Sequence, residues 1–487
     1  MIAHDFPPEG NAGVYRPLRF VRSLPKFGWQ PTVVSLAVNS YERYDPQLLA
    51  AVPATTKIIR VENHDPWRSF QHWRARRLER SLSGASNEKI QQVNSVHEKS
   101  ARVFLREVVR NVEARIYHPD PEMGWIRPAV KATLRICAES RPDVIWATAA
   151  PVSSFVVARR VSESTGIPYV LDFRDSWTIT YNEFEDRRPL WAKQYEHRRM
   201  YRLIQGAKSV VFRFRAEAEC YWRAYEGALQ ASKIYIIPNG YEGSINEFVP
   251  PERQKCQILY TGTLSDYRYD TLLQALQILK ETRSEVAEQL HFHFVGEGAD
   301  ALAKAAANVG VSTMITTQGP TSHEEVTKLS KEAHALLILG RPANMRGYEL
   351  FAAAKFFGYL KLGMPIIGVL PKDETKNVLL QLDVPTVADV DCVPEIVAVL
   401  CFLRDAWSQE RLPSLLPRSS GCKNYSAEYQ TDNLVRALEG RPAFEPYIPG
   451  TVNLPPSLRF EIAQRAGEFN RRKAANAEQD LIMRSQT

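Results

Sequence analysis

Residues 347–369 read GYELFAAAKFFGYLKLGMPIIGV, a pattern that predicts a loop, a helix, a tight turn and a strand. Residues 352–362 contain no proline, are rich in helix formers and carry their apolar side chains at helical spacing. Gly363, followed by Pro365, marks the end of the helix, and the apolar run 366–369 is typical of a buried parallel strand. Because the N-terminus of such a helix presents free N–H groups, we expect it to face a phosphate.

The same stretch resembles the donor-binding helix of the family 4 retaining glycosyltransferases. That helix reads Lys-apolar-apolar-Glu-Tyr-Leu and is followed by a short turn and Gly-x-Pro. Lys355, Tyr359 and Leu360 match this pattern, as do the glycine and the proline of the turn, whereas Gly358 replaces the glutamate. The resemblance implies that the helix holds a nucleotide sugar. An ordinary helix–turn–strand unit is the alternative interpretation.

The glycine at position 358 bears on nucleotide affinity. In relatives, the glutamate at this position accepts hydrogen bonds from the ribose hydroxyls. Glu349 would replace it only if the preceding loop folds back. We therefore expect weaker nucleotide binding than is usual in the family.

Length and composition indicate an ordinary soluble protein of two or three domains. The chain has 487 residues, of which 44% are hydrophobic and 24% charged. There is no transmembrane-length apolar run and no cleavable signal pattern, and the six cysteines form no Cys-x-x-Cys pair. These features favour reduced thiols, a cytoplasmic location and the absence of a zinc site. The net charge of +7 favours anionic partners, but no nucleic-acid-binding signature accompanies it, so we expect no nucleic-acid partner.

The first residues predict a strand, a loop, a helix and a second strand at 32–36. The loop contains Pro7 and Pro8, then Gly10 and Gly13, and it is not a G-x-G-x-x-G dinucleotide fingerprint. Its Phe-Pro-Pro-x-Gly opening resembles the N-terminal domain of family 4 glycosyltransferases, where this loop faces the cleft between domains. The first strand would be very short, which leaves open whether the N-terminus is truncated.

Residues 67–117 interrupt this pattern with a long, charged, helical insertion. Three aromatic residues at 67, 70 and 73 precede a cluster of arginines, namely Arg74, Arg76, Arg77 and Arg80. An amphipathic segment on an anionic membrane surface has this composition, and so does a solvated helical insertion.

A strand at 169–173 leads directly into Arg174, Asp175 and Trp177. The motif Asp-Phe-Arg-Asp-Ser-Trp resembles the Asp-Phe-Arg-Asp-Pro-Trp of the same family, which implies that Arg174 and Asp175 line the acceptor side of the cleft with Gly10 and Gly13. A salt-bridged turn is the alternative. Further strands are predicted at 57–61, 143–147, 208–212 and 233–237, and the Pro-Asn-Gly at 238–240 resembles the hinge of the family.

A second series of alternating strands and helices begins at residue 256, with strands at 256–260, 290–295, 313–317 and 335–339 before the stretch quoted above. We therefore expect an α/β protein of two doubly wound, Rossmann-like domains facing a cleft, the GT-B type. The expected domains are 1–248 on the acceptor side, 249–440 for the nucleotide sugar, and a partly ordered tail at 441–487. The resemblance implies that donor-binding residues are Gly262, Thr263, Gly296, Glu297, Glu349 and Tyr359.

The expected function is transfer of a sugar, as a hexosyltransferase of retaining type, from a nucleotide sugar to a surface-polysaccharide or lipid-linked glycan acceptor. Arg268 and Lys355 are the candidate catalytic residues, because cations near helix N-termini suit a diphosphate leaving group. The resemblance implies that no obligatory metal or other cofactor is needed, and the lack of an Asp-x-Asp pair at any of the strand ends predicted here agrees with this. Alternatively, Arg268 pairs with Asp266 or Asp270 and Lys355 is solvated.

Two other functional classes share this architecture. One is a non-catalytic sugar-nucleotide-binding or scaffold protein, which Gly358 would favour. The other is a sugar-nucleotide epimerase, which would need carboxylates facing the sugar. Peripheral contact with the inner face of the cell membrane is a further expectation.

Overall fold

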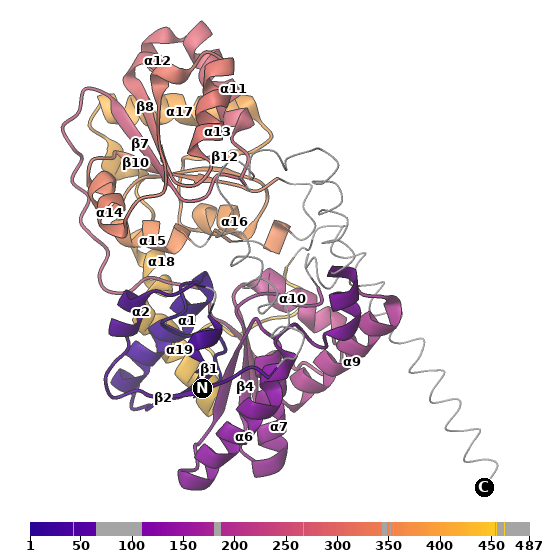
Figure 1. The fold of residues 1–487 in the computed structure, drawn as a ribbon. Coiled ribbons are helices and arrows are strands. Elements are labelled where there is room, and N and C mark those ends of the chain that lie inside the picture. The colour runs from indigo at the N-terminus through magenta and orange to yellow at the C-terminus, as the bar shows by residue number, and fades with distance from the viewer. Residues whose placement is uncertain are drawn as a thin grey trace, which may run out of the picture. The chain divides into compact units, whose positions relative to one another are not determined.

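The chain forms two units, each built on a parallel β-sheet with helices packed against it (Figure 1). The first unit comprises Met1–Ile237 and Thr431–Thr487, and the second comprises Pro238–Gln430. The computed structural model describes residues 1–41, 43–64, 110–179, 187–265, 267–342, 348–350, 352–353, 355–452, 454 and 462.

The sheet of the first unit joins strands from both halves of its sequence. The strands are β1 (Thr32–Leu36), β2 (Lys57–Val61), β3 (Ile145–Ala149), β4 (Tyr169–Phe173), β5 (Ser209–Phe212) and β6 (Ile234–Ile236). They pair in parallel as β1-β2 and as β3-β4-β5-β6. Ile2 bridges Val34 of β1 and Ala147 of β3, so the short N-terminal segment connects the two groups.

Helices cover both faces of this sheet. Buried residues of α1 (Tyr15–Ser23) and α19 (Ala427–Glu439), including Phe20 and Leu434, share one cluster with Trp146 and Val170 of the sheet. On the other face, Phe155 of α7 (Ser153–Thr165) packs on Phe173 with ring centroids 4.9 Å apart. Other helices of this unit are α2 (Pro46–Ala50), α6 (Met123–Glu139), α9 (Leu190–Gly206) and α10 (Arg215–Ala224), and the described residues 110–116 are also helical.

A buried ion pair fixes α1 to the sheet. Arg16 Nη2 lies 2.6 Å from Asp172 Oδ1, and both side chains are almost fully buried. Thr148 Oγ1 donates to the same carboxylate, and Arg16 also donates to the carbonyl of Ile237. Charges without solvent need such partners, because an unpaired buried charge is costly.

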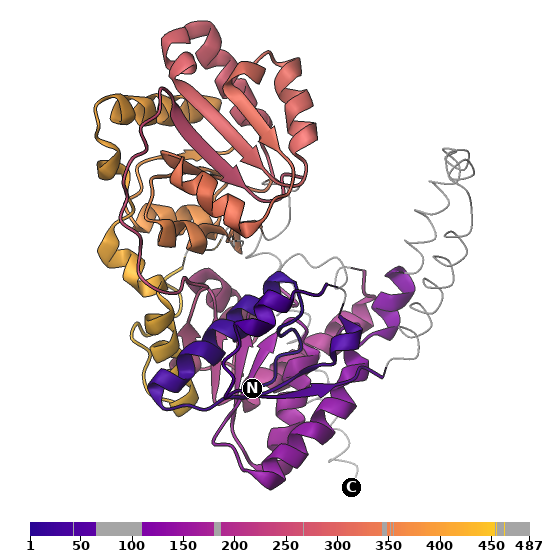
Figure 2. The same cartoon turned by 60° about the vertical axis from the view of Figure 1, so that its left-hand side comes forward.

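The second unit contains a six-stranded parallel sheet in the order β12-β11-β10-β7-β8-β9. Its strands are β7 (Cys256–Thr261), β8 (Leu290–Val295), β9 (Ile315–Gln318), β10 (Ala335–Leu339), β11 (Ile366–Leu370) and β12 (Val387–Asp389). Its helices are α11 (Asp270–Thr282), α12 (Ser284–Gln289), α13 (Ala299–Asn308), α14 (His323–Lys331), α15 (Lys355–Leu362), α16 (Glu374–Gln381), α17 (Val393–Ser408) and α18 (Ser419–Cys422). Figure 2 shows helices on both sides of each sheet.

The expected fold class of two Rossmann-like α/β units is confirmed by these sheets, but several boundaries differ from expectation. The second unit begins at Pro238 rather than at residue 249, and the chain returns to the first unit at Thr431. The return follows from α19, whose apolar face packs on the first sheet. The helix expected over 352–362 begins at Lys355, where the structure starts α15.

Two expected segments fall mainly outside the described residues. The insertion is described only over 110–117, so Trp67, Phe70, Trp73 and the four arginines at 74–80 stay a prediction. Of the expected tail, 441–452, 454 and 462 are described, and Tyr447 donates a hydrogen bond to the buried carboxylate of Glu219.

The ion pair under α1 predicts a large effect of Asp172→Asn. This change leaves the buried Arg16 guanidinium without its counter-charge, so we expect the free energy of unfolding to fall by about 3–5 kcal/mol. Urea unfolding followed by tryptophan fluorescence measures this, because all described tryptophans except Trp407 lie in the first unit.

The matched control is Glu139→Gln, which removes an exposed ion pair with Lys57. That change should cost less than about 1 kcal/mol. Equal effects of the two substitutions would contradict the proposed role of the buried pair.

Candidate active site

Strand order in the second unit reverses at β7. The chain first adds β8 and β9 on one side of β7, and then adds β10, β11 and β12 on the other side. In open parallel α/β sheets, ligands bind at the carboxyl ends of the strands where the order reverses. We therefore expect the segments that follow β7 and β10 to form a ligand-binding site.

The loops after β7 and β8 are in direct contact at this edge. The N–H of Gly262 donates to the carbonyl of Val295, and the N–H of Leu264 donates to the carbonyl of Glu297, both at 2.8 Å. Gly296 has φ +142°, and a Cβ at this residue would lie 2.2 Å from the carbonyl oxygen of Gly262. Only glycine fits this approach, so Gly262 and Gly296 form one compact loop pair.

Lys355 is the first residue of α15, and its side chain points to the end of β7. Its Nζ donates to the carbonyl of Thr261 at 2.8 Å and lies 3.6 Å from the centroid of the Tyr260 ring. It also lies 3.1 Å from the position that a Cβ on Gly262 would occupy. Burial lowers the pKa of Lys355 to about 7, so this is not the solvated lysine of the alternative interpretation.

The other predicted donor residues differ in how closely they approach this point. The hydroxyl of Tyr359 lies 3.2 Å from Thr261 Oγ1, and burial raises the pKa of this phenol. Thr263 is exposed and its carbonyl accepts a hydrogen bond from Tyr260. Glu297 is exposed beside Gly296, and Glu349 is partly buried in the short 3₁₀ turn Tyr348–Leu350.

Arg268 is bound to carboxylates rather than directed at Lys355. Its Nη2 lies 2.8 Å from Asp270 Oδ2, and its Nη1 bonds to Asp391. The hydrogen bonds that the guanidinium donates to Asp270 and the nearby negative charges raise the pKa of Arg268. The pairing with Asp270 is the alternative that the sequence left open, whereas Asp391 follows β12, a strand that the sequence did not reveal. Asp389 and Asp391 form an Asp-x-Asp pair at the end of this strand, so the expectation that no such pair lies at a strand end was wrong. Both carboxylates already pair with cations, Asp389 with Lys376 and Asp391 with Arg268.

Gly358 lies one turn after Lys355, on the exposed side of α15. A Cβ added at Gly358 would meet no atom within 4 Å. A longer side chain therefore fits at this position without displacing its neighbours.

The first unit gathers its predicted residues at the ends of its own strands. A Cβ on Gly13 would lie 1.9 Å from Arg174 Nη1, so the loop and the guanidinium are in close contact. Arg174 also pairs with Asp5, at 3.1 Å, and with Asp175, at 3.5 Å. Gly10 does not join this cluster, because its N–H donates to the carbonyl of Arg43.

His4 belongs to the same cluster and was missed by sequence reasoning. Its Nδ1 lies 2.8 Å from Asp5 and its Nε2 lies 3.2 Å from Glu122. Burial alone would lower the pKa of His4, but the two carboxylates outweigh it and raise the pKa to about 9. The adjacent His-Asp at the end of the first strand was the available signal, whereas Glu122 is too distant in sequence to have been foreseen.

Among the residues that the structure describes, no group of three or more His, Cys, Asp or Glu side chains is arranged to hold a metal ion. Within the same part of the chain, no helix is long and apolar enough to cross a membrane.

Residues 81–242 match the family model described as Glycosyltransferase Family 4. The resemblance to the family 4 glycosyltransferases is confirmed. Among solved structures, the apo form of the lipopolysaccharide outer core galactosyltransferase WaaB is 14% identical, covers 90% of this chain and 98% of its own, and has a TM-score of 0.51. Sucrose-phosphate synthase from Thermosynechococcus elongatus is 12% identical, covers 88% and 94%, and has a TM-score of 0.53. No curated protein sequence matches this chain.

These likenesses show that the chain has the GT-B fold of two Rossmann-like domains. In the second unit, Lys355 and Tyr359 lie with Gly262 and Gly296 at the reversal of strand order, while Arg268 is turned toward Asp270. In the first unit, Gly13, Arg174 and Asp175 lie together.

The environment of His4 predicts a pH dependence of stability. Its pKa is about 9 in the folded chain and about 6.5 when unfolded, so its contribution is fully present below pH 6.5 and is lost as the pH rises through 9. The shift corresponds to a contribution on the order of 3 kcal/mol. We expect the free energy of unfolding of the wild type, relative to that of His4→Gln, to fall between these pH values. Parallel curves for the two proteins would contradict the charged state assigned to His4.

Proposed function

We propose that the chain transfers a hexosyl group from a nucleotide-sugar donor to a surface-polysaccharide or lipid-linked glycan acceptor, with retention of configuration. The observation that carries this proposal is Lys355, which lies half-buried at the N-terminus of α15 and against the Gly262 loop, where the strand order reverses. A cation, a helix N-terminus and a glycine loop at one strand end together suit a diphosphate.

The chemistry that this arrangement supports is departure of a nucleoside diphosphate. Negative charge grows on the diphosphate as the bond to the sugar breaks, and preorganised donors lower the barrier most when they face that charge. The N–H groups at the start of α15 and the Lys355 ammonium would face it. An obligatory metal is not part of this proposal, and no protein nucleophile is assigned.

Lys355 is a better candidate for this role than Arg268. The Arg268 guanidinium already binds two carboxylates, so it would have to leave Asp270 and Asp391 before contacting a phosphate. The Lys355 ammonium contacts a neutral carbonyl and an aromatic ring, and neither opposes an incoming anion. We therefore assign the diphosphate to Lys355, and Arg268 contributes only in a conformation that releases it.

The comparisons support the donor and acceptor classes by likeness. The family model covers residues 81–242, which contain the Arg174-Asp175 turn next to Gly13. WaaB, which shares the fold, is described as a galactosyltransferase of the lipopolysaccharide outer core. A surface glycan acceptor for this chain is consistent with that likeness.

Substitution of Lys355 tests the proposal. UDP-, GDP- and dTDP-sugars are first screened for thermal stabilisation of the protein and for release of nucleoside diphosphate. With the donor so found, Lys355→Met should lower turnover by about 10²–10³-fold, the scale of losing one preorganised charge stabiliser. Lys361→Met is the matched control, because Lys361 is an exposed lysine on the same helix.

The pH dependence of binding adds a second readout for the same pair of variants. Before the diphosphate binds, Lys355 has a pKa of about 7. Above pH 7 the lysine is therefore mostly neutral, and binding of the diphosphate to its charged form takes up a proton. Affinity for the nucleoside diphosphate, measured by calorimetry, should fall toward tenfold per pH unit, and Lys355→Met should remove this slope. If Lys355→Met keeps both the turnover and the pH dependence of affinity of the wild type, the diphosphate binds elsewhere. If the wild type binds the nucleotide sugar without turnover, the non-catalytic class is favoured.

Gly358→Glu should increase the affinity for the nucleoside diphosphate. The space around Gly358 accommodates the side chain, and charged hydrogen bonds to ribose hydroxyls contribute about 1.5–3 kcal/mol, or roughly ten- to a hundredfold in affinity. Calorimetry on the wild type, Gly358→Glu and the uncharged control Gly358→Gln measures this. A Gly358→Glu protein that melts normally and binds no more tightly than Gly358→Gln would contradict the assignment of this helix to the ribose.

A further inference from the structure

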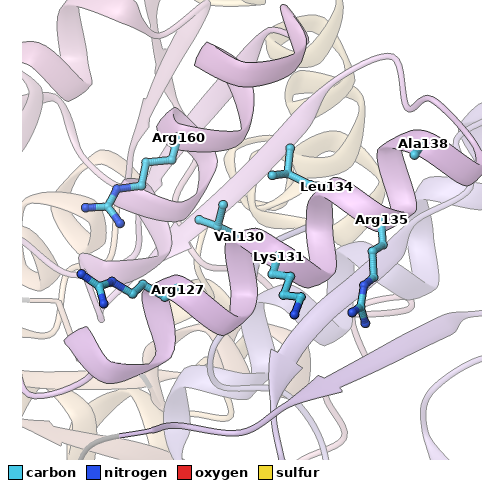
Figure 3. A pocket seen from close by; sticks show the side chains of 7 residues that line it. All are labelled: Arg127, Val130, Lys131, Leu134, Arg135, Ala138 and Arg160. Carbon is cyan, nitrogen blue, oxygen red and sulfur yellow. The ribbon is translucent and has the colours of Figure 1, made fainter.

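One face of the first unit carries cations that no acidic side chain of the described residues neutralises. Along α6, Arg127, Lys131 and Arg135 are exposed and follow one another at intervals of four residues, so they lie on one side of the helix. They line a shallow groove with Arg160 of the neighbouring helix α7 (Figure 3). Figure 3 shows Val130 and Leu134 between the two helices, with Arg127 and Arg160 projecting on the same side.

The groove continues onto a third helix. Arg160 also lines a second groove, between α7 and α9, to which Arg198 and Arg202 contribute from α9. The resulting set, here called the basic face, consists of Arg127, Lys131, Arg135, Arg160, Arg198 and Arg202. Within the part of the chain that the structure describes, none of these six side chains forms an ion pair or a hydrogen bond.

Other arginines on the same helices do form ion pairs, in contrast to the six cations of the basic face. Arg159 pairs with Glu163 at 2.7 Å, and Arg199 lies 3.5 Å from the buried carboxylate of Glu196. The carboxylates of Glu163 and Glu196 are thus already engaged by other arginines, and Glu139 on α6 lies 3.6 Å from Lys57. Six unneutralised cations on adjacent helices repel one another, so an external anionic surface would stabilise this arrangement.

Large apolar side chains are exposed beside the basic face. Trp191 and Tyr195 lie on α9 at the same side as Arg198 and Arg202, and they are 58% and 50% exposed. Leu190, at the start of the helix, is 57% exposed. Tryptophan, tyrosine and leucine next to arginine and lysine are the combination that inserts into the headgroup region of a bilayer.

We propose that the basic face binds the surface of an anionic lipid bilayer, with Trp191, Tyr195 and Leu190 entering the headgroup region. Charge complementarity selects an anionic partner, and the exposed apolar side chains favour lipid over a nucleic acid or a free phosphate. This inference goes beyond the proposed transfer reaction and concerns where it takes place. It is also independent of the arginines at 74–80, which lie outside the described residues.

The test is co-sedimentation of the full chain with vesicles. The wild type should sediment with phosphatidylcholine vesicles that contain phosphatidylglycerol and not with phosphatidylcholine alone, and added salt should weaken binding. Each cation near such a surface contributes about fivefold in partitioning, so Lys131→Gln/Arg135→Gln/Arg160→Gln should bind about a hundredfold more weakly. Trp191→Ser should weaken the binding that remains at high salt.

The matched control carries the same charge change on the second unit. Lys304→Gln/Lys328→Gln/Lys331→Gln removes three exposed lysines of α13 and α14 and should sediment as the wild type does. Melting curves establish that both triple variants are folded.

Three outcomes would overturn the proposal. The first is a wild type that does not sediment with the anionic vesicles, as expected if another segment of the chain covers the basic face. The second is an equal loss of binding in both triple variants, which would show that binding depends on the net charge of the protein and not on the basic face. The third concerns a labelled single-stranded oligonucleotide. If it binds the wild type but not the basic-face variant, while vesicles bind both proteins equally, the basic face binds nucleic acid instead of lipid.

Discussion

The reversal of strand order at β7 is the constraint on which the candidate site depends. Because the chain extends the sheet first through β8 and β9 and then through β10 and β11, the loops after β7 and β10 leave the sheet in opposite directions. The N–H of Arg268 donates to the carbonyl of Gly340, which follows β10. Lys355, at the N-terminus of α15, contacts the end of β7. Lys355 reaches Thr261 only through this topology, since 94 residues separate them in the sequence.

The loops at this edge are shaped by backbone contact rather than by side chains. The carbonyl of Gly262 occupies the space that a Cβ on Gly296 would need. Two loops without side chains at their point of contact bring backbone groups close to a ligand, as in other phosphate-binding loops. In the first unit, Gly13 makes a comparable approach to Arg174, but there the partner is a charged side chain, and the loop is fixed by the Arg174–Asp5 pair.

Much of the fold could be predicted from the sequence, because buried parallel strands are short apolar runs that local pattern reveals. The strands at 32–36, 57–61 and 290–295 were predicted with the bounds that the structure has. β12 was missed, since its three residues carry too little pattern, and with it Asp391, which follows the strand and binds Arg268. Contacts between residues distant in sequence explain why His4 was missed. Its neighbour Asp5 is visible in the sequence, but only the fold brings Glu122 to His4 and Arg174 to Asp5.

The contrast between Arg268 and Lys355 shows what local sequence does not encode, namely solvation. Both are basic residues beside helix N-termini, and sequence alone treats them alike. In the structure, Arg268 is partly exposed and held by two carboxylates, which stabilise its charge before any ligand arrives. Lys355 is half-buried, and no carboxylate of the described residues pairs with it, so burial disfavours its charged form and lowers its pKa. An anion that enters there restores the charged form and gains the full interaction, whereas an anion near Arg268 must compete with Asp270 and Asp391. The residue whose charge the fold leaves uncompensated is therefore the one suited to bind a diphosphate.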